Sequence, residues 1–239
     1  MFHALRRRGG DDQDGRIDDE PDGPTASHSG AMISALFLLI FAIAIIVPWT
    51  VADSARQNTY AEAQSLVEAY WAAGDLPPAE ADSTRAALRD YTRYVSGPEW
   101  RTLRDGELGP DGWSKLDMLR GHLGELTFKE KEQKDALDAV EGHLEEVFAA
   151  RRQRAVDAES SLPGGVLFLT LVTALLVLLL PLVSGAKPRG WVWVPYALLA
   201  VCLAVSVQLA FSINHTFKGP LGVSADAFKT AQQEFDRIP

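Results

Sequence analysis

The sequence contains one cysteine, Cys202, in 239 residues, so no disulfide can form within a single chain. It also lacks the motifs of common active sites, namely Gly-x-Ser-x-Gly, Gly-x-Gly-x-x-Gly and the phosphate-binding loop. Strands are not indicated, because no stretch outside the apolar segments alternates apolar and polar residues. These absences exclude a disulfide scaffold, argue against an enzyme and predict an all-α fold.

Charge is missing from three long segments, 31–52, 162–185 and 190–213, which contain no Asp, Glu, Lys or Arg. The hydrocarbon core of a bilayer is about 30 Å thick, and a helix needs roughly 20 apolar residues to cross it. Each segment meets that length. The sequence therefore predicts an integral membrane protein with three transmembrane helices.

The remaining segments are polar. Residues 1–30 form an acidic tail rich in Gly and Pro, which we expect to be disordered. Residues 53–161 contain 22 acidic and 14 basic side chains, and residues 214–239 form a C-terminal tail. This acidic balance argues against a nucleic-acid partner, which would require clustered Lys and Arg. The first span is predicted to be a retained anchor, because the basic triplet at 6–8 is far from it and its apolar run is long for a signal peptide.

The long segment 53–161 is predicted to be an extramembrane helical bundle. Nothing between Trp49 and Gly74 breaks a helix, so we expect the first span to continue out of the bilayer as one rod. Further stripes at helical spacing follow, and each lasts about two heptads, which favours a bundle over a coiled coil. The members of these stripes are Glu62, Ala63, Leu66, Val67, Tyr70, Thr84, Leu88, Tyr91, Val95, Leu116, Leu119, Leu123, Leu126, Leu137, Val140, Leu144 and Val147.

Candidate sites are few. His143 and Glu146 form a His-x-x-Glu pair, but a zinc site needs three or four ligands, so no metal site and no cofactor are predicted. In the first span Phe37, Phe41 and Ala44 share a face that suits a pore neck, a packing seam or a lipid-facing surface. The spans contain no carboxylate, His or Arg, which argues against an ion-coupled transporter.

Short motifs in a fixed order resemble the bacterial bestrophin-like family, a domain of unknown function, over residues 37–235. The resemblance depends on their order and spacing along the chain. The motif residues are Glu62-Ala63, Leu66, Tyr70, Leu76-Pro77, Arg85, Leu88, Tyr91, Glu99-Trp100, Arg151, Arg154, Leu162-Pro163 and Phe217-x-Gly219.

The resemblance implies a remote architectural similarity to bestrophins, in which five subunits surround an ion pore. It also implies a cytosolic helical region and an external N-terminal tail. The chain departs from the family pattern by lacking the usual first span. A second departure follows the last span, where Asn214 and Thr216 replace an acid and a proline. Asn214, Phe217 and Gly219 are the candidate membrane-proximal functional motif.

Two hypotheses follow. In the first, the chain forms a homo-oligomeric ion channel in a bacterial inner membrane, with a pore neck at Phe37, Phe41 and Ala44. The acidic region beside the pore would favour cations. In the second, the chain is a membrane-anchored scaffold or sensor that binds a protein partner through residues 53–161. A discrete pentamer would favour the channel.

Overall fold

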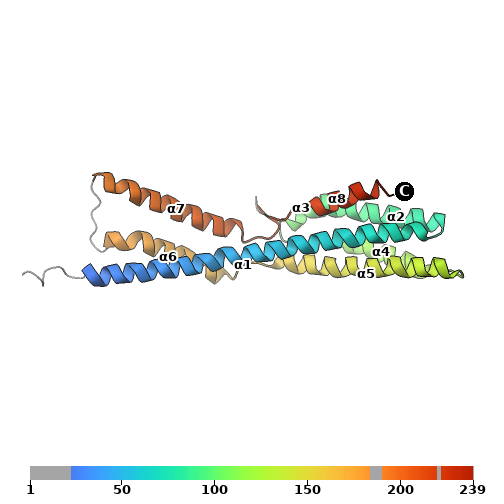
Figure 1. Cartoon of the computed structure of the whole chain (residues 1–239), viewed down its shortest axis with the longest axis horizontal. Coiled ribbons are helices and arrows are strands. Elements are labelled where there is room, and N and C mark those ends of the chain that lie inside the picture. The colour runs from blue at the N-terminus through green and yellow to red at the C-terminus, as the bar shows by residue number, and fades with distance from the viewer. Residues whose placement is uncertain (1–22, 184–189, 220–221, 239) are drawn as a thin grey trace, which may run out of the picture.

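The longest element is α1 (Gly23–Ala72), a single helix of 50 residues that runs through most of the length of the molecule (Figure 1). The computed structural model describes residues 23–183, 190–219 and 222–238. Pro48 lies inside α1 without ending it. The prediction that the first span continues beyond the apolar segment as one helical rod is confirmed.

The N-terminal end of α1 differs from the predicted boundary. Residues 23–30, which we expected in the disordered tail, form the first turns of the helix. Pro24 suits this place, because the first amides of a helix have no intrahelical acceptor and its missing N–H removes no bond. The rest of the predicted tail, residues 1–22, lies outside the described residues.

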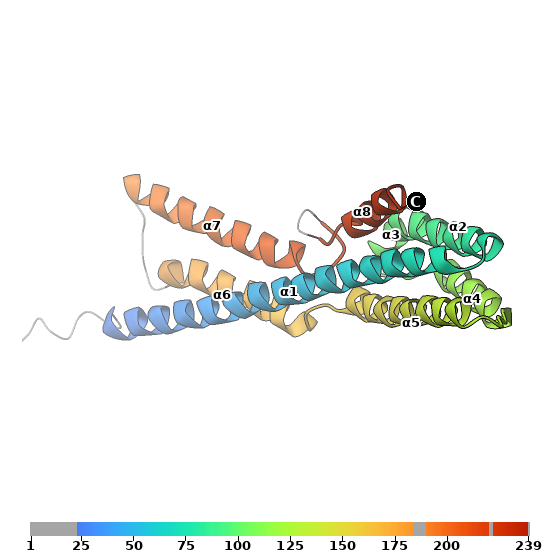
Figure 2. The same ribbon diagram turned by 45° about the vertical axis from the view of Figure 1, so that its right-hand side comes forward.

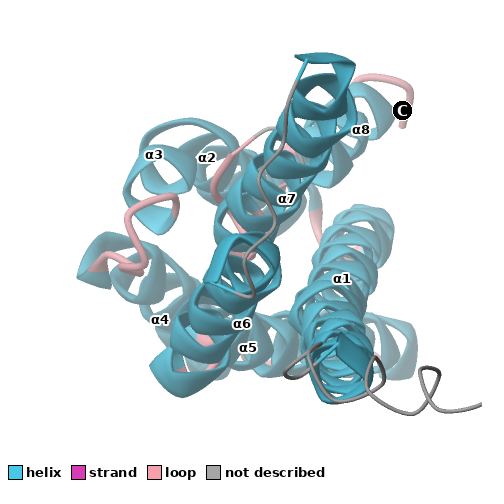
Figure 3. Cartoon of the chain, turned by 90° about the vertical axis from the view of Figure 1, so that its left-hand side faces the viewer, coloured by secondary structure: helices cyan, strands magenta, loops and turns pink. Residues whose placement is uncertain are grey.

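Two further apolar helices accompany the N-terminal half of α1, namely α6 (Gly164–Val183) and α7 (Trp193–Ser212), which follows a 3-10 turn, η3 (Gly190–Val192). The end-on view in Figure 3 shows α1, α6 and α7 side by side at this end. We name the part formed by α6, α7 and the N-terminal half of α1 the membrane half. All three are long and apolar enough to cross a membrane, as predicted. The predicted end of the second span at Gly185 falls outside the described residues.

The other half of α1 packs against the helices of the extramembrane bundle (Figures 1 and 2). Across the three described ranges no strand occurs, so the all-α prediction is confirmed. The elements of this half are η1 (Ala73–Asp75), α2 (Pro78–Tyr94), the π-helical turn η2 (Val95–Glu99), α3 (Trp100–Leu103), α4 (Pro110–Glu125), α5 (Lys131–Glu159) and α8 (Asp226–Phe235).

One hydrophobic core holds this bundle together. The predicted stripes face it, with Leu88, Leu116 and Leu144 almost wholly buried. Helix α8 closes the core from the C-terminal side, because its Phe235 stacks on Tyr70 with ring centroids 4.4 Å apart. The C-terminal tail is therefore a structural part of the bundle, which a small amphipathic helix can join by burying one apolar face.

Candidate functional site

Four charged side chains are buried in the core of the bundle. They are Glu62 on α1, Glu99 at the end of η2, and Arg151 and Arg154 on α5, and each is at most 1% exposed. Together with the buried Tyr91 on α2 they form what we name the ionic cluster. Buried charges are expensive unless they are paired, so the geometry of these pairs decides whether the site is stable.

Glu99 binds both arginines. Arg151 forms a bidentate pair with it, in which Nη1 donates to Oε1 at 2.8 Å and Nη2 donates to Oε2 at 2.6 Å. Arg154 Nη1 donates to the same Oε1 at 2.9 Å. Bidentate arginine–carboxylate pairs are among the stronger and more directional contacts in proteins.

Glu62 completes the cluster from the side of α1. Arg154 donates to it through Nε at 2.9 Å and Nη2 at 3.0 Å. The Tyr91 hydroxyl donates to Glu62 Oε1 at 2.6 Å and accepts from Arg151 Nη1 at 3.2 Å. Two carboxylates and two guanidinium groups thus cancel in formal charge, and Tyr91 joins the two pairs into one network.

The environment keeps these groups in the charge states that the network needs. Burial raises the pKa of Glu99, but hydrogen bonds from Arg151 and the charges of Arg154 and Arg151 outweigh it, so the pKa lies below its ordinary value. Burial, reinforced by the charge of Glu62, holds the pKa of Tyr91 well above its ordinary value. Tyr91 therefore keeps its proton and remains a donor to Glu62.

Aromatic rings cover the guanidinium groups. Arg154 lies 5.3 Å from the ring centroid of Phe228 and 5.9 Å from that of Trp100. Arg151 lies 4.7 Å from the ring of Trp113. Cations above aromatic faces gain further stabilisation, and the rings exclude water from the ion pairs. Trp100 and Tyr91 are both buried in the core.

The cluster is not fully satisfied. Arg151 Nε and Trp100 Nε1 are buried and have no hydrogen-bond partner among the described residues. A buried donor without a partner costs about 1–3 kcal/mol, so the cluster is not an arrangement of maximal stability. What it does provide is a fixed position. It ties α1 and α5, the helices that lead to spans one and two, to the turn after α2.

The predicted membrane-proximal motif lies beside the cluster. Phe217 packs edge-on against Trp100, with ring centroids 5.5 Å apart, and Trp100 in turn lies against Arg154. Gly219 has a φ of 87°, a conformation that residues with a Cβ rarely adopt. Asn214 Oδ1 accepts a hydrogen bond from the backbone N–H of Leu162 at 2.8 Å. The motif therefore joins the end of α7 both to the start of span two and to the cluster.

Replacing Asn214 with alanine is expected to loosen the connection before α6. The Leu162 amide would lose its acceptor, at a cost of about 1–2 kcal/mol, whereas Asn214→Asp retains an acceptor oxygen. Hydrogen–deuterium exchange of residues 160–166 checks this, and we expect about tenfold faster exchange at Leu162 in the alanine variant. His215→Ala, at the exposed neighbouring position, is the control. Equal exchange in the Ala and Asp variants would contradict the assigned role.

The residues of the predicted pore neck lie on the covered face of α1. Phe37 packs in a cluster with Ala174 and Leu203, and it stacks on Phe41 at 5.7 Å. Ala44 is fully buried against residues at the start of α6 and the end of α7. Within one chain these side chains fill the seam between spans. Their role in a pore depends on the assembly and stays a prediction.

The His143–Glu146 pair lies on the surface of α5. His143 Nδ1 is 3.2 Å from Glu146 Oε2, and Ser65 also donates to Glu146 at 3.1 Å. Within the described ranges no group of three or more His, Cys, Asp or Glu side chains is placed to hold a metal ion.

Comparison with known proteins gives one family. The family model described as the Bestrophin-like domain matches residues 25–228, which is most of the chain. No curated protein and no solved structure matches the sequence of this chain. The matched range includes the three apolar helices, the ionic cluster and the membrane-proximal motif.

Proposed function

Because the chain belongs to the bestrophin-like family, we propose that it is the subunit of a homo-oligomeric ion channel in a bacterial inner membrane, with α1 lining the pore. Three spans cannot enclose a water-filled path, so several copies must form a ring. Five is the number that the similarity to bestrophins implies. No enzymatic step is part of this proposal.

An uninterrupted exposed stripe on α1 carries the proposal. Its members recur every three or four residues through the membrane half and on into the bundle, and none is covered by another helix of the chain. Around a ring axis, such a stripe would form one continuous lining. The stripe consists of Leu36, Leu39, Ile43, Ile46, Thr50, Ser54, Gln57, Ala61, Gln64 and Glu68.

The chemistry of the stripe changes at the end of the apolar segment. The stripe members from Leu36 to Ile46 are apolar. The stripe members from Thr50 to Gln64 are small or polar and carry no charge. Rings of apolar side chains close a narrow pore by expelling water from it. The polar part would form a wetted vestibule beside an acidic region, which favours cations. The apolar part of the stripe is thus a second candidate neck, on the face opposite to Phe37.

Ion flux into liposomes that contain the protein distinguishes the two candidate necks. Ile43→Asn is expected to raise ion flux by about tenfold, the effect of lowering the barrier by about 1.4 kcal/mol in a wetted constriction. Leu198→Asn, at an exposed position on α7, is the control and should leave the flux unchanged. A gain confined to Phe37→Ala would instead support the neck on the covered face.

Native mass spectrometry of the full chain tests the assembly itself. A discrete ring of several copies is expected. A stable monomer without flux would overturn the channel and favour the scaffold, which has one observation of its own. Tyr60 and Trp71 are 52% and 50% exposed on α1, and large exposed aromatics are typical anchors for a protein partner.

A further inference from the structure

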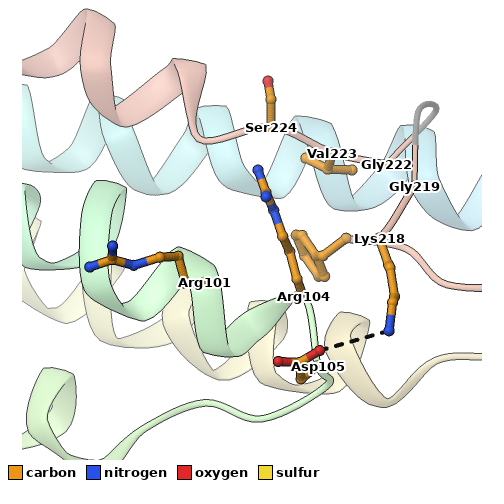
Figure 4. Close-up of a pocket in the computed structure, with 9 residues that line it drawn as sticks. Arg101, Arg104, Asp105, Lys218, Gly219, Gly222, Val223 and Ser224 are labelled. Atoms are coloured by element: carbon orange, nitrogen blue, oxygen red, sulfur yellow. Dashed lines mark ion pairs between the residues drawn. The ribbon is translucent and has the colours of Figure 1, made fainter.

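A basic cavity lies where the loop after α7 meets α3. Its volume is about 610 Å³, and its lining includes Arg101, Arg104, Lys218 and Ser224 (Figure 4). Lys218 follows the last span by six residues, since α7 ends at Ser212. The cavity is therefore close to the level at which lipid headgroups begin, and we name it the juxtamembrane cavity.

The charge of the cavity opposes that of its surroundings. Residues 53–161 carry an excess of acidic side chains, yet three cations and one carboxylate, Asp105, line this cavity. Lys218 Nζ lies 3.7 Å from Asp105 Oδ1, and both side chains are largely exposed, so this pair is weak. Within the described part of the chain, Arg101 and Arg104 form no ion pair and no hydrogen bond.

The side chains point in different directions, which separates the centre of the cavity from its rim. Figure 4 shows Arg104 extending from the end of α3 towards Ser224, and Lys218 on the adjacent loop turned to Asp105, whereas Arg101 points away along the helix. Gly219 and Gly222 of the same loop also line the cavity. Arg104 and Lys218 thus border the cavity on two sides, and a ligand between them has to compete with Asp105 for Lys218.

We propose that the juxtamembrane cavity binds a phosphate group, held by Arg104 and Lys218. Guanidinium and ammonium groups are the donors that proteins use for phosphate. The cavity is far larger than a phosphate ion and lies next to the last span, which favours the headgroup of an anionic phospholipid over free phosphate. Juxtamembrane cations contribute to such binding individually.

The bound headgroup would act on the membrane-proximal motif. Phe217 and Gly219 line the same cavity, and Phe217 contacts Trp100 beside the ionic cluster. Binding there would hold the loop after α7 against α3. This inference does not depend on the channel, because a scaffold would bind the same headgroup.

Native mass spectrometry of the full chain, purified in a neutral detergent, tests the proposal. The probes are phosphatidylglycerol, which is anionic, and phosphatidylcholine, which has no net charge. We expect the wild-type chain to retain phosphatidylglycerol preferentially. Each cation removed should weaken retention by roughly fivefold, so the double variant Arg104→Gln/Lys218→Gln should lose about 20-fold or more.

The double variant Lys131→Gln/Lys134→Gln is the matched control. It removes the same charge from exposed positions at the start of α5, away from the membrane half (Figure 1), and should bind as the wild type does. A second arm measures the melting temperature with inorganic phosphate. Stabilisation by inorganic phosphate that disappears in Arg104→Gln/Lys218→Gln, without lipid preference, would support the cavity with free phosphate as its source. Equal lipid retention and no phosphate effect in all three proteins would overturn the proposal.

Discussion

Replacing Glu99 with glutamine is expected to lower the free energy of unfolding of the extramembrane bundle by about 3–5 kcal/mol. Glutamine has nearly the same shape, but it carries no charge and offers one acceptor oxygen where Glu99 offers two. Arg151 and Arg154 would then remain buried with only the charge of Glu62 between them. Few single substitutions lower the free energy of unfolding by so much, and those that leave a buried charge uncompensated are among them.

A denaturant titration of the full chain in mild detergent checks this, followed by tryptophan fluorescence, since Trp100 and Trp113 lie against the cluster. Glu68→Gln is the control, because it makes the same chemical change at an exposed site on α1 and should shift stability by less than about 0.5 kcal/mol. Equal shifts in both variants would show that the cluster carries no uncompensated charge when Glu99 is lost.

A double variant separates loss of the pair from loss of packing. Arg151→Met in the Glu99→Gln background removes the cation that Glu99 had neutralised and leaves Arg154 with its bidentate partner Glu62. We expect the double variant to be less destabilised than the sum of the two single variants. An interaction energy near zero would mean that the two residues contribute independently.

The membrane half of the fold follows directly from the sequence. In a bilayer the length of an uncharged segment fixes a span, and this condition is local, so α1, α6 and α7 could be predicted from residues in succession. The bundle was predictable to the same extent. Leu116, Leu119 and Leu123 repeat at helical spacing, and the structure places all three in the core.

The ionic cluster was not predicted, although its signal is present in the sequence. Glu62 lies on the apolar stripe with Leu66, and Arg151 and Arg154 extend the stripe of Leu144 and Val147 at the same spacing. A charge on an apolar stripe indicates a buried ion. The partners could not be found from spacing, because Arg154 and Glu62 are 92 positions apart and meet through tertiary packing.

All five residues of the ionic cluster are among the motif residues that carry the family resemblance. These residues belong to separate short motifs along the sequence, and the structure brings all five into one network. The close packing around Gly112, in contrast, could not be predicted from the sequence, because a glycine near the start of a helix is common. Its close contacts come from α5 and η2, which are distant in the sequence.

Replacing Gly112 with alanine is therefore expected to destabilise the bundle by about 3 kcal/mol. The added Cβ would overlap the guanidinium group of Arg151 and the carboxylate of Glu99, and it would lie 2.6 Å from Arg151 Cζ. Neither group can move without breaking the bidentate pair, because both are fully buried. Overpacking and loss of a buried ion pair then act together.

Gly121 on the same helix, α4, is the matched control. A Cβ at this position meets nothing within 4 Å, so Gly121→Ala should stabilise the bundle by about 0.5–1 kcal/mol through helix propensity alone. The same substitution thus has opposite signs at two positions of one helix, and thermal unfolding of the full chain in detergent measures both. If Gly112→Ala also stabilised the protein, the close contact of α4 with the Arg151–Glu99 pair would be refuted. If the signs differ as expected, the cluster requires a glycine in the first turn of α4, and the turn after α2 is held in place by α4 as well as by α5.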